Sequence, residues 1–244
     1  MIRALAAALA VAGVQASVAR APAGVPVLMY HRVDAVVPRD AVGRDLTVEP
    51  HAFAAQLRFL RDRHIDAITA SELVEDIAAG HLPRRAVVLT FDDGYADNAT
   101  TAFPLLVKYH ARGTFYVSSG FVGTPGHLSW KQMRAMQGAG MEIACHGSEH
   151  LDLSTLDRAG QLREAGGCVR RLERYLGGMR SVTYAYPAGK YDATTFSVLR
   201  GLRIRAAFTE RPGAVVDLRR PYELPRRRVR HDDDVAAFGA LTTQ

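Results

Sequence analysis

The sequence is poor in several residue types that would mark common kinds of protein. It contains only two cysteines, Cys145 and Cys168, and one tryptophan in 244 residues. Two cysteines exclude a framework of several disulfides, although an exported chain could form one bridge or bury each cysteine as a small apolar side chain. The apolar run at residues 4–14 is shorter than the roughly 20 residues of a membrane span, so we expect no stable transmembrane helix.

The start of the chain differs from the rest. Residues 1–19 combine Arg3, an Ala-rich apolar stretch and small residues before the candidate cleavage points after Ala16 or Ala19. This pattern is typical of a secretory signal peptide. We therefore predict a signal peptide at 1–19, export to the periplasm or beyond, and one folded domain at 20–244, because a chain of this length has little room for a second.

The net charge of +6 comes largely from the carboxyl-terminal part of the chain, which contains Arg219, Arg220, Arg226, Arg227, Arg228 and Arg230. Such a cluster can attract nucleic acid or an anionic polymer. A solvated basic edge, balanced by the three aspartates at 232–234, is the better interpretation, because no aromatic side chain lies between the arginines to stack on bases. We therefore expect no nucleic-acid partner.

Short apolar, β-branched runs alternate with helical patterns along most of the chain. This alternation is typical of βα units around a parallel sheet and predicts an α/β fold. Seven candidate strands in one domain favour a barrel over a small open sheet. The candidate strands are 25–30, 65–69, 86–91, 113–118, 141–145, 182–186 and 205–208.

Chemically reactive side chains directly follow four of these strands. In α/β barrels the catalytic groups converge at the carboxyl ends of the strands, so we expect these four segments to face one pocket. The residues are His31, Asp92, Asp93, His146, His150 and Tyr186.

The paired aspartates and the two histidines together suggest a metal site. Adjacent side chains point to opposite faces of a regular strand, so the strand must end at Asp92 and Asp93, and Gly94 gives the backbone the freedom to do so. His146 and His150, at i and i+4 of a helical turn, can reach a common ion. Two histidines and one carboxylate leave a coordination position open on a catalytic divalent metal; Zn²⁺ is the first choice, and Co²⁺, Ni²⁺ or Fe²⁺ are compatible.

The sequence around these residues resembles the polysaccharide deacetylase family, the NodB-homology carbohydrate esterases of family 4. Residues 90–94, Thr-Phe-Asp-Asp-Gly, reproduce the first motif of the family. Residues 141–143, Met-Glu-Ile, leading into His146 and His150, are similar to its second motif. The resemblance extends from residue 25 to about residue 238, which is nearly all of the predicted mature chain.

The resemblance implies a distorted (β/α)7 barrel and a metal-dependent hydrolase. Asp92 is then the base that activates a water molecule. Residues 184–192 are similar to the third motif, in the variant of the branch that deacetylates poly-β-1,6-N-acetylglucosamine, where the backbone N–H of Tyr186 would help to hold the oxyanion. The implied metal ligands are Asp93, His146 and His150.

The opening segment, residues 25–33, also resembles this branch, in which its histidine is the general acid. His31 is therefore the candidate to protonate the departing sugar amine, as its unperturbed pKa near working pH allows. His31 could instead only hydrogen-bond a neighbouring loop. Its main rival as the acid is His231, although residues 224–226 before it resemble a late structural motif of the same branch.

Three positions depart from the family pattern. Gly147 replaces the small hydroxyl residue that usually follows the first metal histidine, so a hydrogen bond that steadies this loop would be missing. Cys145 replaces the usual serine, and its thiolate could bind the metal or be oxidised. The usual arginine before the third-motif proline is absent, which leaves Asp92 without its orienting partner unless Arg32 or Lys190 reaches it.

The predicted substrate is poly-β-1,6-N-acetylglucosamine or a related N-acetylglucosamine polymer, from which the enzyme would release acetate. Peptidoglycan, chitin oligomers and O-acetylated xylan are alternatives, because loops rather than pocket residues select the polymer. A carbohydrate-binding protein without turnover is the alternative from another class. We expect no second domain that would position a glycan, so a partner could supply that function.

Overall fold

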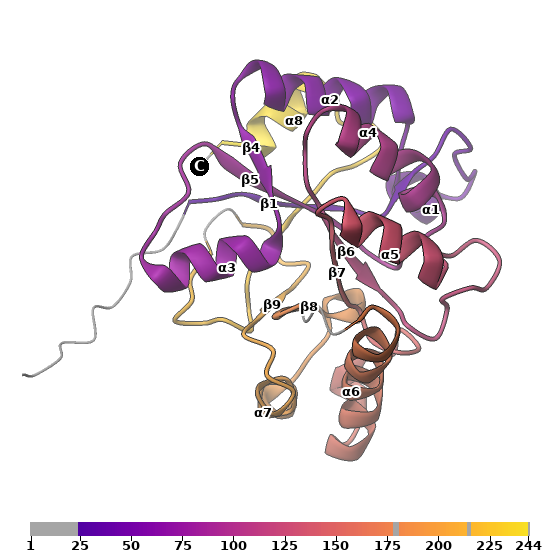
Figure 1. Cartoon of the computed structure of the whole chain (residues 1–244), viewed down its shortest axis with the longest axis vertical. Coiled ribbons are helices and arrows are strands. Elements are labelled where there is room, and N and C mark those ends of the chain that lie inside the picture. Colours follow the sequence, from indigo (N-terminus) through magenta and orange to yellow (C-terminus); the bar gives the residue numbers. More distant parts are fainter. Residues whose placement is uncertain (1–23, 178–180, 214–215, 244) are drawn as a thin grey trace, which may run out of the picture.

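The computed structural model describes residues 24–177, 181–213 and 216–243, so the predicted signal peptide lies outside the described residues. The main sheet has the order β10-β1-β5-β6-β7-β8-β9, with β4 paired to the first half of β5 (Figure 1). A small second sheet pairs β2 with β3. The strands are β1 (Val27–Tyr30), β2 (Arg32–Val33), β3 (Thr47–Val48), β4 (Asp66–Ile68), β5 (Ala86–Phe91), β6 (Thr114–Val117), β7 (Glu142–Cys145), β8 (Thr183–Ala185), β9 (Ala206–Phe208) and β10 (Arg227–Arg228).

Helices separate most of the strands and cover the outside of the sheet (Figure 1). None of the helices in the described part of the chain is both long and apolar enough to cross a bilayer. The α-helices are α1 (Ala41–Asp45), α2 (Pro50–Asp62), α3 (Ala70–Ala79), α4 (Phe103–Lys108), α5 (Trp130–Gly138), α6 (Arg158–Tyr175), α7 (Ala193–Gly201) and α8 (Val235–Leu241). The short helices are η1 (Asn98–Ala102), η2 (Leu153–Thr155) and η3 (Pro187–Gly189).

The seven predicted strands are all present, each within two residues of its predicted bounds. Every ladder in the main sheet is parallel, and the sheet curls into the NodB-type barrel that the sequence resemblance implies. Short strands of buried, mostly apolar residues are typical of a parallel sheet covered on both faces. The predicted α/β barrel is therefore confirmed.

A segment near the carboxyl end links the two edges of the curled sheet. Leu224 forms a parallel bridge with Phe208 of β9, and β10 pairs with β1 in the register Leu28 to Arg227. Residues 224–228 thus touch both edge strands. The sequence pattern did not predict β10, because two arginines in sequence carry no strand signal of their own.

The inner face of the barrel is filled mainly by small and β-branched side chains, whereas larger side chains pack between the sheet and the outer helices. Four apolar residues of α3, Ala70, Leu73, Val74 and Ile77, belong to the inner cluster. This helix therefore closes the end of the barrel at which the strands begin.

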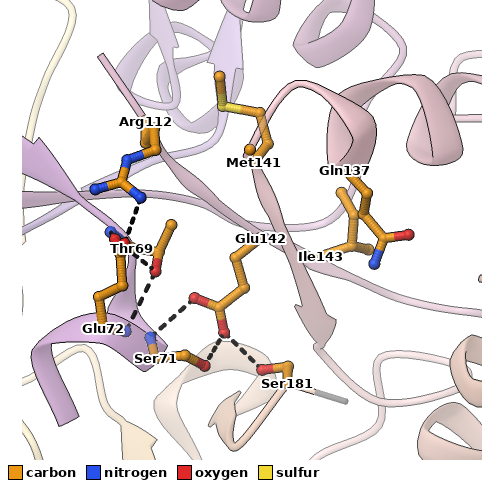
Figure 2. A pocket seen from close by; sticks show the side chains of 10 residues that line it. Thr69, Ser71, Glu72, Arg112, Gln137, Met141, Glu142, Ile143 and Ser181 are labelled. Atoms are coloured by element: carbon orange, nitrogen blue, oxygen red, sulfur yellow. Dashed lines mark hydrogen bonds and ion pairs between the residues drawn. The ribbon is translucent and has the colours of Figure 1, made fainter. Parts of the chain in front are cut away.

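At this closed end the carboxylate of Glu142 accepts several hydrogen bonds, and those from Ser71 and Ser181 are drawn in Figure 2. Glu142, the first residue of β7, accepts hydrogen bonds from Ser71 N–H at 2.9 Å and from the hydroxyls of Thr114 at 2.8 Å and Ser181 at 2.7 Å. A cavity of about 200 Å³ lies beside it. Because Glu142 begins β7 and His146 follows the end of that strand, this cavity lies at the opposite end of the sheet from the predicted site.

Candidate metal centre and catalytic groups

The predicted site residues lie at the carboxyl end of the sheet. All ladders are parallel, so the residues that follow β1, β5, β7 and β8 come together there. After Phe91 the chain turns sharply, with φ of 73° at Asp93 and 77° at Gly94. A side chain at Gly94 would also bring its Cβ within 2.9 Å of Val117. The predicted end of the strand at the aspartate pair is therefore confirmed, and Gly94 makes it possible.

Among the described residues, Asp93, His146 and His150 form a group that can hold a metal ion, with ligand atoms all within 4.8 Å of one another. Asp93 Oδ1 lies 3.4 Å from His146 Nε2 and 3.3 Å from His150 Nε2. This oxygen is buried and has no hydrogen-bond partner. Buried polar atoms in proteins are normally paired, and a divalent cation would satisfy the oxygen and both ring nitrogens at once. The three residues therefore fit a metal.

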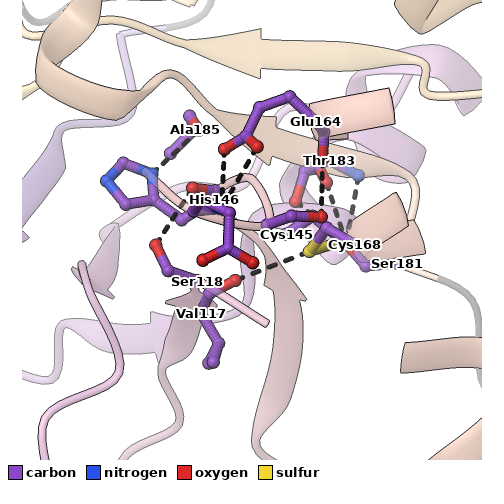
Figure 3. Close-up of a disulfide and its surroundings, with 11 residues drawn as sticks. Val117, Ser118, Cys145, His146, Glu164, Cys168, Ser181, Thr183 and Ala185 are labelled. Carbon is purple, nitrogen blue, oxygen red and sulfur yellow. Dashed lines mark hydrogen bonds between the residues drawn. A yellow bond between two sulfur atoms is a disulfide. The ribbon is translucent and has the colours of Figure 1, made fainter. Parts of the chain in front are cut away.

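A backbone contact fixes the orientation of the first histidine (Figure 3). His146 Nδ1 lies 2.8 Å from the Ala185 carbonyl oxygen, which can only accept a hydrogen bond. The proton is therefore on Nδ1, and the lone pair of Nε2 faces Asp93, as a metal ligand requires. His146 is 2% exposed and His150 34% exposed, so the cluster opens to solvent on the His150 side.

The two histidines do not lie on a helical turn, and that prediction is wrong. Residues 146–150 form a loop, in which φ is 87° at Gly147 and 56° at His150. Left-handed backbone at these two positions is incompatible with a right-handed helix. The loop nevertheless brings the two imidazole rings to a centroid separation of 5.0 Å.

Asp92 has a strong partner that the sequence did not reveal. Arg226 donates from Nη1 to Asp92 Oδ1 at 2.7 Å and from Nη2 to Oδ2 at 2.6 Å, and both side chains are buried. The expected candidates have other positions: Arg32 pairs with Asp34 and Asp97, and no contact joins Lys190 to Asp92 in the described structure. The assignment of Arg226 to a solvated basic edge is therefore wrong, because the segment that links the sheet edges carries it into the barrel.

Both aspartates are ionised at neutral pH. Burial by itself would raise the pKa of Asp92, but the charge of Arg226, followed by that of His146, lowers it below its usual value. Burial likewise opposes ionisation of Asp93, but the adjacent imidazoles of His146 and His150 lower its pKa far below the usual range. Asp92 is thus in the form that accepts a proton, and Asp93 is in the form that binds a cation.

His31 and His231 differ in their surroundings. His31 is 7% exposed, and burial lowers its pKa although the charges of Asp92 and Asp93 act in the other direction. Its imidazole has no hydrogen bond to the described residues. His231 instead donates from Nδ1 to the Thr47 carbonyl at 2.9 Å, which holds its ring against β3. The geometry therefore favours His31 over His231 as the group beside the reacting atoms.

The Tyr186 amide does not have the environment predicted for it. Its N–H donates to the Phe208 carbonyl at 3.1 Å in the ladder with β9, so no hydrogen remains for an oxyanion. The tyrosine hydroxyl also donates inward, to the Tyr222 carbonyl at 2.9 Å. Pro187 has no N–H, and the next amide, that of Ala188, makes no hydrogen bond to the described residues. Ala188 has φ of 50°, a conformation rare for residues other than glycine.

The two cysteines form a disulfide that joins the end of β7 to α6 (Figure 3). Cys145 and Cys168 are 3% and 0% exposed, with Cα atoms 5.9 Å apart. The pairing resolves the alternatives left open by the sequence. Because its sulfur is in the disulfide, Cys145 is not a thiolate ligand for the metal.

Comparison with known proteins agrees with this geometry. Residues 79–207 match the polysaccharide deacetylase family. A putative polysaccharide deacetylase of Bacillus subtilis, YxkH, is 30% identical over 220 residues, which cover 90% of this chain and 76% of that protein. A poly-β-1,6-N-acetyl-D-glucosamine N-deacetylase of Staphylococcus aureus is 23% identical over 196 residues, covering 75% of this chain and 68% of that protein.

Among solved structures, the Streptococcus pyogenes deacetylase PplD, in complex with acetate, aligns with a TM-score of 0.85 and 27% identity. The alignment covers 92% of this chain and 100% of PplD. The fold, the family match over more than half of the sequence and the relative at 30% identity agree with one another. The chain belongs to the polysaccharide deacetylase family.

Proposed function

We propose that this polysaccharide deacetylase removes N-acetyl groups from an N-acetylglucosamine polymer, with poly-β-1,6-N-acetylglucosamine as the first substrate to test. The Staphylococcus aureus relative carries that activity in its name, and the segments around His31 and Tyr186 resemble the same branch. Acetate, the product of such a hydrolysis, is bound in the PplD structure. Peptidoglycan, chitin oligomers and O-acetylated xylan are the alternative substrates.

The observation that carries this proposal is the contrast between two adjacent carboxylates. Asp93 has a buried oxygen without a hydrogen-bond donor, facing two histidine nitrogens, whereas Asp92 is held on both oxygens by Arg226. A protein that only binds carbohydrate needs neither a metal site open on one side nor a fixed base beside it. Metal-assisted hydrolysis uses both.

Asp93, His146 and His150 would hold the metal, with Zn²⁺ as the first choice and Co²⁺, Ni²⁺ or Fe²⁺ as suitable substitutes. When bound, such a cation polarises the carbonyl of the substrate and lowers the pKa of water to about 7.

Asp92 accepts the proton of the attacking water. Each of its oxygens receives one N–H from Arg226, which leaves lone pairs free for the water and fixes the direction in which they point. His31, close to both aspartates, gives a proton to the departing amine. Burial lowers the pKa of His31, whereas the charges of Asp92 and Asp93 favour the protonated form that donates the proton.

The oxyanion requires an amide other than that of Tyr186. Ala188 is the nearest residue after Tyr186 on this segment that still has an N–H, and this N–H makes no hydrogen bond to the described residues. Its segment packs beside the metal ligands, because Pro187 lies next to Gly147. We therefore assign the oxyanion contact to the Ala188 N–H.

Acetate release from β-1,6-linked and β-1,4-linked N-acetylglucosamine oligomers tests this proposal. We expect release that a chelator abolishes, that Asp92→Asn lacks, and that the control Asp62→Asn keeps, since Asp62 is exposed and pairs with the neighbouring Arg61. The preferred linkage identifies the branch. Release from neither oligomer by metal-loaded protein would contradict the proposal and favour another acetylated polymer or a binding function.

We extend the proposal to export, with residues 1–19 as the signal peptide. Expression with the natural amino terminus, followed by mass spectrometry of the protein recovered outside the cytoplasm, should show a chain that begins after Ala16 or Ala19. A full-length chain retained in the cytoplasm would contradict it.

A further inference from the structure

Glu164 is a buried acidic residue in the middle of α6 that takes no part in the chemistry described above. Its side chain is 3% exposed and is directed at the loop that carries His146 and His150 (Figure 3). No ion pair joins it to a lysine or arginine within the described ranges. A buried carboxylate without a cation must be stabilised by hydrogen-bond donors, and here the loop supplies them.

The contacts between Glu164 and the loop involve both side-chain oxygens and its backbone. The Glu149 N–H lies 2.9 Å from Oε1 and 3.1 Å from Oε2, and the Leu151 N–H donates to Oε1 at 3.1 Å. The Ser148 hydroxyl donates to the Glu164 carbonyl at 3.0 Å. The residues on either side of His150 are thus fastened to α6 by one side chain.

Two glycines make room for this arrangement. A Cβ at Gly147 would collide with Glu164 Oε1, and a Cβ at Gly167 would lie 2.6 Å from the Ser148 hydroxyl. The carboxylate therefore occupies the space that a side chain at position 147 would need. The departure from the family pattern at Gly147 has its structural counterpart in Glu164.

The hydrogen bonds of Glu164 hold the loop around His150, a proposed metal ligand with an unfavourable backbone conformation. His150 has φ of 56°, and such a conformation in a residue other than glycine persists only where its surroundings hold it. The Glu149 and Leu151 N–H groups are the immediate neighbours of His150 in sequence, and both are bound to Glu164. Without this acceptor, the loop could relax and move the His150 ring away from Asp93.

We infer that Glu164 is a positioning residue, which fixes His150 in the orientation that binds the metal. This inference rests on the proposed metal-dependent function, and it concerns metal affinity rather than folding alone. Groups that orient metal ligands typically change metal affinity by about 10- to 100-fold when they are replaced.

Titration of metal-free protein with Co²⁺, followed by its visible absorption, tests the inference without an activity measurement. We expect Glu164→Gln to weaken Co²⁺ binding by about 10- to 100-fold and to change the visible spectrum. Glu142→Gln is the matched control, because Glu142 also accepts several hydrogen bonds but lies at the opposite end of the sheet. It should lower the melting temperature and leave the Kd for Co²⁺ within twofold of the wild-type value.

The outcomes separate this inference from the proposed function. Wild-type protein that binds no Co²⁺ would overturn both, whereas equal Kd values for the wild type and Glu164→Gln would overturn only the role of Glu164. Hydrogen exchange in metal-free wild-type protein gives a second test that requires no variant. The Glu149 and Leu151 amides should be protected, and exchange at the rate of exposed loop amides would overturn the inference.

Discussion

Two carboxylates, Glu142 and Asp93, lie at opposite ends of the barrel and differ in their hydrogen bonds. Glu142 accepts hydrogen bonds from the Ser71 amide and from surrounding hydroxyls, so both of its carboxylate oxygens have donors (Figure 2). Asp93 has a buried oxygen with no donor, opposite two histidine nitrogens. Glu142 connects α3 to the sheet, whereas Asp93 belongs to the group that we propose as the metal site.

The comparison predicts opposite effects for the two residues on activity and stability. Asp93→Asn should abolish metal binding and lower deacetylase activity by at least about 10³-fold, because it removes a charged ligand of the group that stabilises the transition state. Asparagine tolerates the left-handed backbone at this position. The melting temperature of the metal-free protein should stay the same or rise, since no donor loses its acceptor. A large loss of stability without loss of metal binding would contradict the assignment of Asp93 to metal binding.

The Asp92–Arg226 pair predicts the largest loss of stability. Arg226→Met leaves a buried charge without its partner and should lower the free energy of unfolding by about 3–5 kcal/mol, measured by urea denaturation of metal-free protein. Replacing both partners, in Asp92→Asn with Arg226→Met, should restore part of this loss. A double variant less stable than Arg226→Met would contradict the account.

This pair also predicts a dependence on pH. The pKa of Asp92 is lowered in the folded protein, so the pair contributes stability above the unfolded-state pKa of about 3.9 and loses it as the pH falls below that value. The stability difference between wild type and Arg226→Met should therefore shrink as the pH falls below about 3.9, toward the lower pKa of folded Asp92. A difference that is independent of pH would exclude ionised Asp92 as its source.

The disulfide lies at the other end of β7 from Glu142, because Cys145 is the last residue of that strand. It therefore allows the stability contributions of the two ends of β7 to be compared. The bridge closes a loop with a sequence separation of 23, which corresponds to about 3 kcal/mol of stabilisation in the chain-entropy model. Cys145→Ala with Cys168→Ala should lower the free energy of unfolding by about that amount, while the metal ligands remain in place. Thermal unfolding of the oxidised protein and of the double variant measures the difference, and equal stabilities would contradict it.

Glu142→Gln should have the smallest of these effects. An amide can accept only some of the hydrogen bonds that the carboxylate receives, so we expect a loss of about 1–3 kcal/mol. Acetate release measured below the melting temperature should stay within twofold of the wild-type rate. A specific loss of activity in a folded Glu142→Gln variant would show that this end of the barrel takes part in the reaction.

The features that could be predicted from the sequence are local ones. Each of the seven predicted strands is a short, mostly apolar run. Asp92, Asp93 and His146 directly follow strand ends, and His150 lies in the loop after β7, so the parallel fold brings them together. Gly94 marks the turn that makes this possible. The sequence pattern wrongly predicted a helical turn at residues 146–150, because a spacing of four between histidines fits a helical turn and a loop equally well. The packing of Glu164 against Gly147, which accompanies the loop, cannot be read from that spacing.

The features that could not be predicted depend on distant contacts. Arg226 reaches Asp92 across 134 residues, and only the closure of the sheet by residues 224–228 explains why this arginine among several is buried. The amide of Tyr186 pairs with β9, a contact set by strand register rather than by sequence motif. Both cases concern the partners of the candidate site residues rather than the residues themselves.

Calorimetric titration of Zn²⁺ into metal-free protein, with acetate release followed in the same samples, is the most direct test of metal-dependent deacetylation with Asp93 as a metal ligand. We expect one bound Zn²⁺ per wild-type chain, none per Asp93→Asn chain, and deacetylation of the N-acetylglucosamine oligomer that rises in proportion to the bound metal. Zn²⁺ bound equally by the Asp93→Asn variant, or acetate release independent of bound metal, would contradict it.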